Sequence, residues 1–432
     1  MTSPTPISFS EATRAWVRVA LLSFGGPAGQ IAVMHRILVE EKRWISEERF
    51  LHALSYCMLL PGPEAQQLAT YIGWLLHGTR GGLVAGLLFI LPGLVAIMAL
   101  SFVYVIWGGH PLLAGVFLGL KAAVIALVLE ALIRLGWRAL KTASAKILAV
   151  VAFVAIAVLR MPFPLVVLAA GVAGYLLARR TTPVPAAAAS REAASQPAAP
   201  APFRWLRVLA LWLPLWFAPV LMAALLVGPE HRYTQLGVFF SQMAVVSFGG
   251  AYAVLAYVAQ QAVERFGWIT AGQMMDGLGL AESTPGPLIM VVQFVGFLAA
   301  YQSTASAYPL AAGVIGALIT VWVTFVPSFL WIFLGAPYVE RLRGNVAWNS
   351  ALNAITAAVV GVIAILALWF AVHVLFADVD ARGLPDIASL QWKPAALTAI
   401  ALLLLFAIRW GLARTLLVCA ALGAALAPWG RS

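Results

Sequence analysis

Long runs of apolar residues dominate this chain, and the polar residues gather in short stretches between them. Residues 83–107 and 353–376 are two such runs, and each exceeds the ~18 residues that indicate a membrane-spanning helix. The pattern predicts continuous helices at residues 82–107, 112–135, 146–160, 162–178, 205–227, 308–335, 350–376, 393–408 and 411–428. We therefore predict an all-α polytopic membrane protein.

Four further apolar segments are interrupted by glycine and proline. Residues 9–42 contain a Gly-Gly-Pro break, residues 48–78 contain a Pro-Gly-Pro break, and related breaks occur near residues 249 and 285. Proline removes a backbone donor and glycine frees the backbone, so each segment should form two half-helices. A half-helix of roughly 14 residues is about 21 Å long, shorter than the ~30 Å hydrocarbon core. We expect broken or re-entrant helices, and the pattern leaves open whether they span.

These motifs occur twice at one fixed distance. Ser-Phe-Gly-Gly at residues 23–26 returns at 247–250, and Pro-Gly-Pro at 61–63 returns at 285–287. The offset is 224 in both cases (247 − 23 and 285 − 61), whereas later motifs recur at an offset of 235. One unit was therefore duplicated and one copy gained a small insertion. A repeat of this length in an apolar chain is typical of a transporter built from two halves.

The repeats define the predicted domains. We assign a first repeat to residues 1–180, a Pro- and Ala-rich linker to 181–204, an extra transmembrane helix to 205–228 and a second repeat to 229–432. Each repeat has four continuous helices and two broken segments, so its number of crossings is even whether the breaks span or re-enter. The extra helix adds one crossing, so the second repeat should be inverted relative to the first.

Charge supports this topology. Only 10% of the residues are charged and 63% are hydrophobic, whereas a soluble domain has about 25% charged residues. The net charge of +11 is assigned to cytoplasmic loops and not to nucleic-acid binding. Residues 134–146 are basic, and the matching loop at 378–386 is acidic. We therefore expect a cytoplasmic N-terminus and a periplasmic C-terminus.

The breaks are the predicted substrate site. The second half of a broken helix begins with unpaired backbone N–H groups at the positive end of its dipole, which favours an anion. The alternative is that glycine and proline only permit close packing of helices. The uncharged residues of the candidate site are Ser23, Gly25, Gly26, Pro61, Gly62, Pro63, Gln66, Gln67, Gly249, Gly250, Ser283, Thr284 and Gly286.

Charged residues within the apolar segments are few. Lys121 lies in the middle of a predicted helix, where a cation needs a counter-ion or water. It could neutralise a bound anion or form a structural pair with Glu130. Arg18 and Arg36 are candidates for drawing in the anion, although Arg18 could instead extend to the membrane surface. Glu64 and Glu282 adjoin the two Pro-Gly-Pro motifs. Glu64, in a first helical turn, could complement the helix dipole, and the alternative is a protonatable group that couples transport to protons.

Enzyme and metal chemistry have no recognisable signature. The six histidines lack metal-ligand spacing, and no Gly-Lys-Ser/Thr phosphate-binding motif is present. We expect no catalytic residue, no metal, no cofactor and no direct use of ATP. Cys57 and Cys419 are flanked by apolar residues and should be core residues without a disulfide.

The motifs resemble those of the chromate ion transporter family in its long, two-domain form. The similarity rests on Ser-Phe-Gly-Gly-Pro at residues 23–27, Lys-Arg-Trp-Ile at 42–45, the stretch 56–73 and Ala-Glu-Ser-Thr-Pro-Gly-Pro at 281–287. The resemblance implies a multi-pass carrier of the bacterial inner membrane that exports chromate, confers chromate resistance and is driven by ion gradients. Ala251 replaces Pro27 and the second repeat has few basic residues, so we expect the first repeat to supply most anion contacts.

The residues themselves do not distinguish chromate from sulfate, phosphate or a carboxylate. A sulfate carrier is therefore the alternative within the same class. In another class, a non-transporting assembly factor or an intramembrane enzyme would lack substrate-dependent flux. Beyond the lipid bilayer, the expected partners are chromate, sulfate as a competing anion and protons as a coupling ion. A homodimer is one of the oligomeric states that the sequence leaves open.

Overall fold

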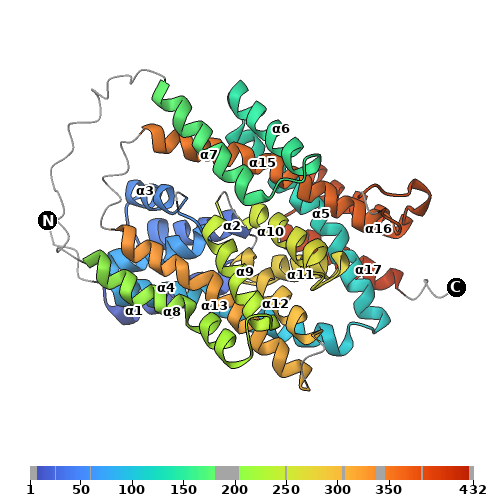
Figure 1. The fold of residues 1–432 in the computed structure, drawn as a ribbon, viewed down its shortest axis with the longest axis horizontal. Coiled ribbons are helices and arrows are strands. Elements are labelled where there is room, and N and C mark those ends of the chain that lie inside the picture. The colour runs from blue at the N-terminus through green and yellow to red at the C-terminus, as the bar shows by residue number, and fades with distance from the viewer. Residues whose placement is uncertain are drawn as a thin grey trace.

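The computed structural model describes residues 7–24, 26–58, 60–180, 204–248, 251–303, 307–336, 346–380 and 383–427. These residues form a helical molecule in which helices from both halves of the chain interleave (Figure 1). The described part has no β-structure beyond isolated bridges in the loop around residues 376–390. The all-α prediction is confirmed. Gly25, Gly249, Gly250 and the linker at 181–203 lie outside the described residues.

The first half begins with the helices of the two broken segments and continues with long apolar helices. Its elements are α1 (Phe9–Leu22), α2 (Gly26–His35), the π-helix Arg36–Glu41, α3 (Glu47–Cys57), α4 (Glu64–Trp107), α5 (Pro111–Ala139), α6 (Ala143–Ala157) and α7 (Phe163–Arg180).

The second half starts with the extra helix and repeats the same order. Its elements are α8 (Arg204–Leu226), α9 (Arg232–Val246), α10 (Ala251–Ala259), the π-helix Gln260–Arg265, α11 (Ala271–Ser283), the 3-10 helix Leu288–Met290, α12 (Val291–Tyr301), α13 (Pro309–Gly335), α15 (Val346–Leu375), α16 (Trp392–Leu402), the π-helix Leu403–Ala407 and α17 (Leu412–Leu426).

Five of these helices are long and apolar enough to cross a membrane, and they belong to α4, α5, α8, α13 and α15. α4 has non-helical backbone at His77 and Gly78, so it joins the second half of a broken segment to the continuous helix predicted at 82–107. Every predicted continuous helix has a counterpart in the structure, and both broken segments of the first repeat are divided where glycine and proline indicated.

Unusual backbone features show how completely the two halves correspond. The π-helices Arg36–Glu41 and Gln260–Arg265 are offset by 224 residues (260 − 36). Arg43, with a φ of 52°, matches Gly267, with a φ of 58°. Arg160 and Arg409 also share a left-handed φ, of 50° and 59°, at an offset of 249 (409 − 160). The duplication therefore extends to the last pair of helices, where the sequence motifs have faded.

The two halves exchange their final helices. α6 and α7 pack mainly on α15 of the second half, and α16 and α17 pack on α5 of the first half. Close approach requires small residues, and a Cβ on Gly119 would lie 1.9 Å from the carbonyl oxygen of Cys419. Such small-residue contacts are the usual means of packing transmembrane helices. Neither half is therefore complete without the other.

The extra helix α8 lies against α13. The indole of Trp216 donates to the carbonyl of Val323 at 3.0 Å, and that of Trp322 donates to the carbonyl of Leu215 at 2.7 Å. Cys57 and Cys419 are buried free thiols, so the expectation of core cysteines without a disulfide is confirmed.

Candidate functional site

The breaks of the two repeats meet through a reciprocal pair of backbone hydrogen bonds. Gly62 N–H donates to the carbonyl of Ser247 at 2.9 Å, and Gly286 N–H donates to the carbonyl of Ser23 at 2.9 Å. Both members of the second pair lie 224 residues from their counterparts in the first (286 − 62 and 247 − 23). Such a reciprocal contact indicates that the repeats are related by a local two-fold axis.

The glycines of both Pro-Gly-Pro motifs are required by this geometry. Gly62 has a φ of 122° and Gly286 a φ of 107°, a region that other residues rarely adopt. A Cβ on Gly286 would lie 2.9 Å from the Cα of Gly93, and one on Gly62 would lie 2.8 Å from the hydroxyl of Ser328. Gly93 and Ser328 are themselves matched positions (328 − 93 = 235). The same loop is therefore clamped by the opposite repeat on both sides.

This arrangement brings half-helix N-termini together in two pairs. Gly62 precedes α4 and Ser247 precedes α10, so their hydrogen bond joins the starts of these two helices. In the same way, Gly286 and Ser23 join the start of the 3-10 helix Leu288–Met290 to the start of α2. The first N–H groups of a helix have no partner within it and carry the positive end of its dipole, so two helix starts at one junction form an environment suited to an anion.

Four buried glutamines surround the junctions. Their amide groups donate to backbone carbonyls or to a hydroxyl: Gln30 to the carbonyl of Gly286 (2.6 Å), Gln67 to that of Pro61 (2.7 Å), Gln293 to that of Leu94 (2.9 Å) and Gln66 to the hydroxyl of Thr70 (3.3 Å). Among the described residues, the amide oxygens of Gln66, Gln67 and Gln293 and the hydroxyl of Ser328 are buried without a partner. Buried polar atoms are normally paired with protein or water, so these atoms indicate a site for a polar ligand or water.

Acidic groups adjoin the same breaks. Glu282 is 3% exposed; its Oε1 accepts a hydrogen bond from the hydroxyl of Tyr252, and its Oε2 has no partner. Tyr252 is the second residue of α10, so Glu282 reaches the start of that half-helix. Glu130 and Arg134 of α5 lie within electrostatic reach of Glu282. Glu64 is the first residue of α4, where a carboxylate complements the helix dipole.

The predicted hydroxyl residues use their donors locally. Ser23 donates to the carbonyl of Val19 at 2.7 Å, Ser283 to that of Leu280 at 2.8 Å and Thr284 to that of Ala281 at 3.2 Å. These bonds satisfy carbonyls at the ends of α1 and α11. Gly26, with a φ of 71°, has no heavy atom within 4 Å of an added Cβ, so the start of α2 has open space beside it.

Two of the predicted cations lie away from the breaks. Arg18 and Arg36 both pair with Glu41, and their side chains are 50% and 52% exposed. They lie on the surface between α1 and the π-helix that follows α2. The structure therefore places neither guanidinium at a junction.

Lys121 is paired across the repeats. Its Nζ lies 3.1 Å from Oδ2 of Asp276 on α11, and the hydroxyl of Tyr104 on α4 donates to the same oxygen at 2.9 Å. The alternative pairing of Lys121 with Glu130 is wrong, because Glu130 pairs with Arg134. Asp276 lies nine positions before Pro285 (285 − 276), which is about 13 Å at helical rise. Lys121 is thus separate from the junctions.

Sequence reasoning missed Asp276, Gln30 and Tyr252. Asp276 had a detectable signal, since it is an acid within an apolar segment next to a break, and such residues usually have a function. Gln30 and Tyr252 had no comparable signal, because their roles depend on contacts with segments distant in the sequence.

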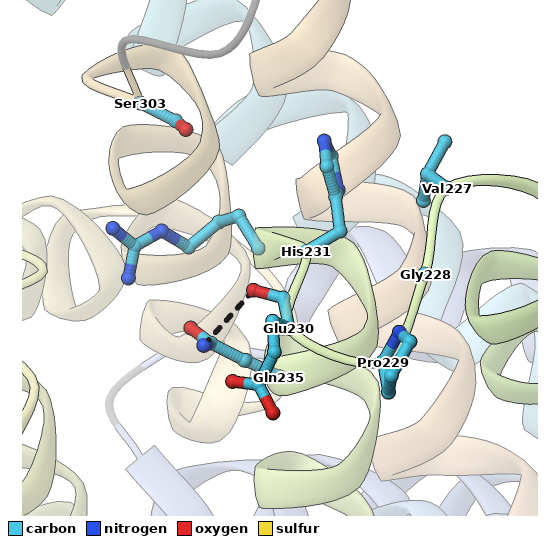
Figure 2. A pocket seen from close by; sticks show the side chains of 8 residues that line it. Val227, Gly228, Pro229, Glu230, His231, Gln235 and Ser303 are labelled. Carbon is cyan, nitrogen blue, oxygen red and sulfur yellow. Dashed lines mark hydrogen bonds between the residues drawn. The ribbon is translucent and has the colours of Figure 1, made fainter.

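A surface pocket lies at the far end of α9 from the break (Figure 2). It is lined by Val227, Gly228, Pro229, Glu230, His231, Arg232, Gln235 and Ser303. The 15 residues of α9 separate this pocket from Ser247 by about 22 Å. It contains none of the predicted site residues. The described residues contain no group of three or more side chains suited to a metal ion.

Comparison with known proteins agrees with the motifs. The family model described as "Chromate transporter" matches residues 10–175 and 234–426. The "Chromate transport protein" of Pseudomonas aeruginosa is 33% identical over 83% of this chain and 80% of the relative. The protein of that name from Cupriavidus metallidurans is 29% identical, over 84% of this chain and 82% of the relative. The "Probable chromate transport protein" of Synechococcus elongatus is 28% identical over 83% of both. No solved structure matches this chain.

Proposed function

This chain belongs to the chromate transporter family, and from that membership we propose that it is a secondary transporter that exports chromate from the cytoplasm and confers chromate resistance. The substrate is a divalent tetrahedral oxyanion, so the site must offer many hydrogen-bond donors without a resident metal or cofactor. The relatives are named as transport proteins, in agreement with a carrier and not an enzyme.

The observation that carries the proposal is the reciprocal contact between breaks. Two junctions, each joining a segment of one repeat to a segment of the other, place half-helix starts, whose first N–H groups have no partner within the helix, beside buried amide side chains. Because each junction contains both repeats, movement of one repeat against the other would open and close it. Inverted-repeat transporters use this geometry to expose a midplane site alternately.

The membrane potential supplies the driving force in this scheme. An inside-negative potential favours the exit of a dianion by about 4.6 kcal/mol per 100 mV, which is twice the value for one charge. Nucleotide hydrolysis is then unnecessary. If one proton leaves with the dianion, the complex keeps one negative charge and the potential still drives it outward.

We assign proton coupling to Glu282. A dianion at the start of α10 favours the protonated form of this buried carboxyl, whose Oε2 has no partner and whose Oε1 is held by Tyr252. Anion binding and proton binding should therefore assist each other. Glu64, at the start of α4, is the carboxyl group on the other side of the junction that Gly62 and Ser247 form.

The proposed membrane arrangement follows from charge and parity. The protein would lie in the bacterial inner membrane with repeats at residues 1–180 and 229–432 in opposite orientations, the linker in the cytoplasm and the C-terminus in the periplasm. The two-fold relation of the breaks is compatible with an axis in the membrane plane, and the basic loops of the first repeat favour that axis over one along the membrane normal.

Flux of radiolabelled chromate into proteoliposomes, with membrane potential and pH gradient imposed separately, tests this function. We expect flux that follows the potential, is competed by sulfate and is faster when the chromate-loading side is acidic. A sulfate carrier would show tighter competition by sulfate than by chromate itself. An assembly factor would show no anion-dependent flux, and that result would overturn the proposal.

A further inference from the structure

The ion pair between Lys121 and Asp276 is the only contact between opposite charges that the described residues bury at a repeat–repeat contact. Lys121 belongs to α5 of the first repeat and Asp276 to α11 of the second. Lys121 is the eleventh residue of the 29-residue α5, so it lies about 6 Å from the helix centre. Charges at this depth are costly and usually functional.

The two partners differ in access. The side chain of Asp276 is 4% exposed, whereas that of Lys121 is 25% exposed. Oδ2 of Asp276 receives Lys121 and the hydroxyl of Tyr104, and Oδ1 is buried without a partner. Lys121 is thus an accessible cation held by a buried carboxylate that is itself incompletely satisfied. Because this carboxylate is incompletely satisfied, another anion can replace it as the partner of Lys121.

The repeats show that this pair is dispensable for the backbone. The position that matches Lys121 is Thr356, whose hydroxyl donates to the carbonyl of Leu352 in its own helix at 2.9 Å. The position that matches Asp276 is His52 (276 − 224). The corresponding helices of the two repeats therefore form with and without the ion pair. The charges of Lys121 and Asp276 are thus not needed to build these helices and must serve another role.

We propose that the carboxylate of Asp276 competes with the transported dianion for pairing with Lys121. This competition sets the affinity with which Lys121 binds the dianion. This inference rests on the proposed anion transport. When the dianion takes Lys121, Asp276 keeps only the hydrogen bond from Tyr104. With the anion absent, Asp276 neutralises Lys121 and keeps the pathway from trapping other anions. The site therefore binds the dianion and also releases it.

The surroundings of Asp276 make the effect specific. The charged and titratable groups that contact it among the described residues are Lys121 from α5 and Tyr104 from α4. Helices α12, α15 and α17 also pack on α11, and their described residues add no charged contact to this carboxylate. Changes at these three positions should therefore report on this competition.

Equilibrium binding of radiolabelled chromate and sulfate to the purified full-length protein tests the proposal separately from flux. Asp276→Asn removes the competing charge, so it should lower Kd about tenfold, within the usual range of coupling between sites. Tyr104→Phe removes a donor from Asp276 and leaves it more dependent on Lys121, so it should raise Kd about threefold. Lys121→Met with Asp276→Asn removes both charges and should raise Kd above that of the unchanged protein.

Glu11→Gln is the control, because Glu11 is a carboxylate of α1 that pairs with exposed Lys42. Its Kd should equal that of the unchanged protein. A purely structural ion pair would leave Kd the same in Tyr104→Phe, and it would make Asp276→Asn bind no tighter; either result overturns the inference. Binding that follows our expectation without any flux would instead refute the proposed function and leave the competition intact.

Discussion

The two repeats share one backbone and carry different side chains. Both contain a π-helix at the same position, a left-handed residue after it and a glycine of positive φ between two prolines. The first repeat supplies Gln30, Gln66, Gln67 and Lys121, whereas the second supplies Asp276, Glu282 and Gln293. The two repeats therefore share a symmetric backbone, whereas the polar and charged side chains that they contribute differ.

The difference also separates two roles for charge. The first repeat contributes the accessible cation, and the second contributes the buried acids that oppose or neutralise it. An anion pathway with fixed positive charge alone would hold its substrate too tightly. Acids from the opposite repeat allow release when the repeats move, which is a requirement of any carrier.

The largest expected effect is at the matched pair Lys121 and Thr356. Lys121→Ala should reduce chromate efflux by about 100-fold or more, the scale of losing one key stabilising charge. Thr356→Ala should stay within about twofold, because it removes only a bond within its own helix. Flux in inverted membrane vesicles measures both.

Lys121→Ala leaves Asp276 as an uncompensated buried charge, which can itself destabilise the protein. The neutral double variant Lys121→Ala with Asp276→Asn is therefore the control for expression and insertion. Normal efflux by either form would remove Lys121 from the mechanism.

The next effect compares the two glycines of the breaks. Gly286→Ala forces a Cβ against the backbone of Gly93, whereas Gly62→Ala meets the side chains of Gln67 and Ser328. Backbone cannot move aside easily, so Gly286→Ala should cost more stability, about 1–3 kcal/mol from overpacking beyond the cost of positive φ that both share. Thermal unfolding in detergent measures the difference, and equal losses would show that the two breaks are clamped alike.

A smaller effect is expected from Glu282→Gln. The amide imitates the protonated acid, so flux should stay near its acidic value and lose most of its response to pH. The unchanged protein should be fastest when the loading side is acidic, because protonation of Glu282 assists anion binding. Flux at a fixed membrane potential across a pH series checks this, with Glu11→Gln, at a surface carboxylate that pairs with Lys42, as a control that keeps its pH response. A full pH response in Glu282→Gln would exclude Glu282 from coupling.

The opposite orientation of the repeats can be tested without altering activity. Single cysteines replacing Lys141 and Asp378, in a background without Cys57 and Cys419, occupy exposed positions in corresponding loops. A membrane-impermeant thiol reagent added to spheroplasts should label position 378 and spare position 141. Labelling of both, or of position 141 alone, would contradict the inverted arrangement.

The fold was largely predictable because membrane burial leaves a strong pattern. Apolar length located the continuous helices, and glycine with proline located the breaks. The exchange of final helices between the halves could not be predicted, since it depends on contacts such as Gly119 with Cys419. The junctions were predicted as anion sites, but their pairing was not, because backbone hydrogen bonds such as Gly62 to Ser247 leave no trace in side-chain identity.

The cations were the least predictable part of the site. The sequence gives similar signals for Lys121, Arg18 and Arg36. In the structure Arg18 and Arg36 pair with the surface residue Glu41, whereas Lys121 pairs with the buried Asp276. Side-chain length allows each to reach several partners, and only the packing of α1, α5 and α11 decides between them.

The most direct test of the account is the location of bound chromate by anomalous scattering from chromium in crystals of the full-length protein. We predict a peak at a junction of half-helix starts, beside Ser23 and Gly286 or beside Ser247 and Gly62. A peak confined to the pocket around Arg232, or uninterrupted helices through the two Pro-Gly-Pro motifs, would contradict the central claim that the anion binds at the junctions between the breaks of the two repeats.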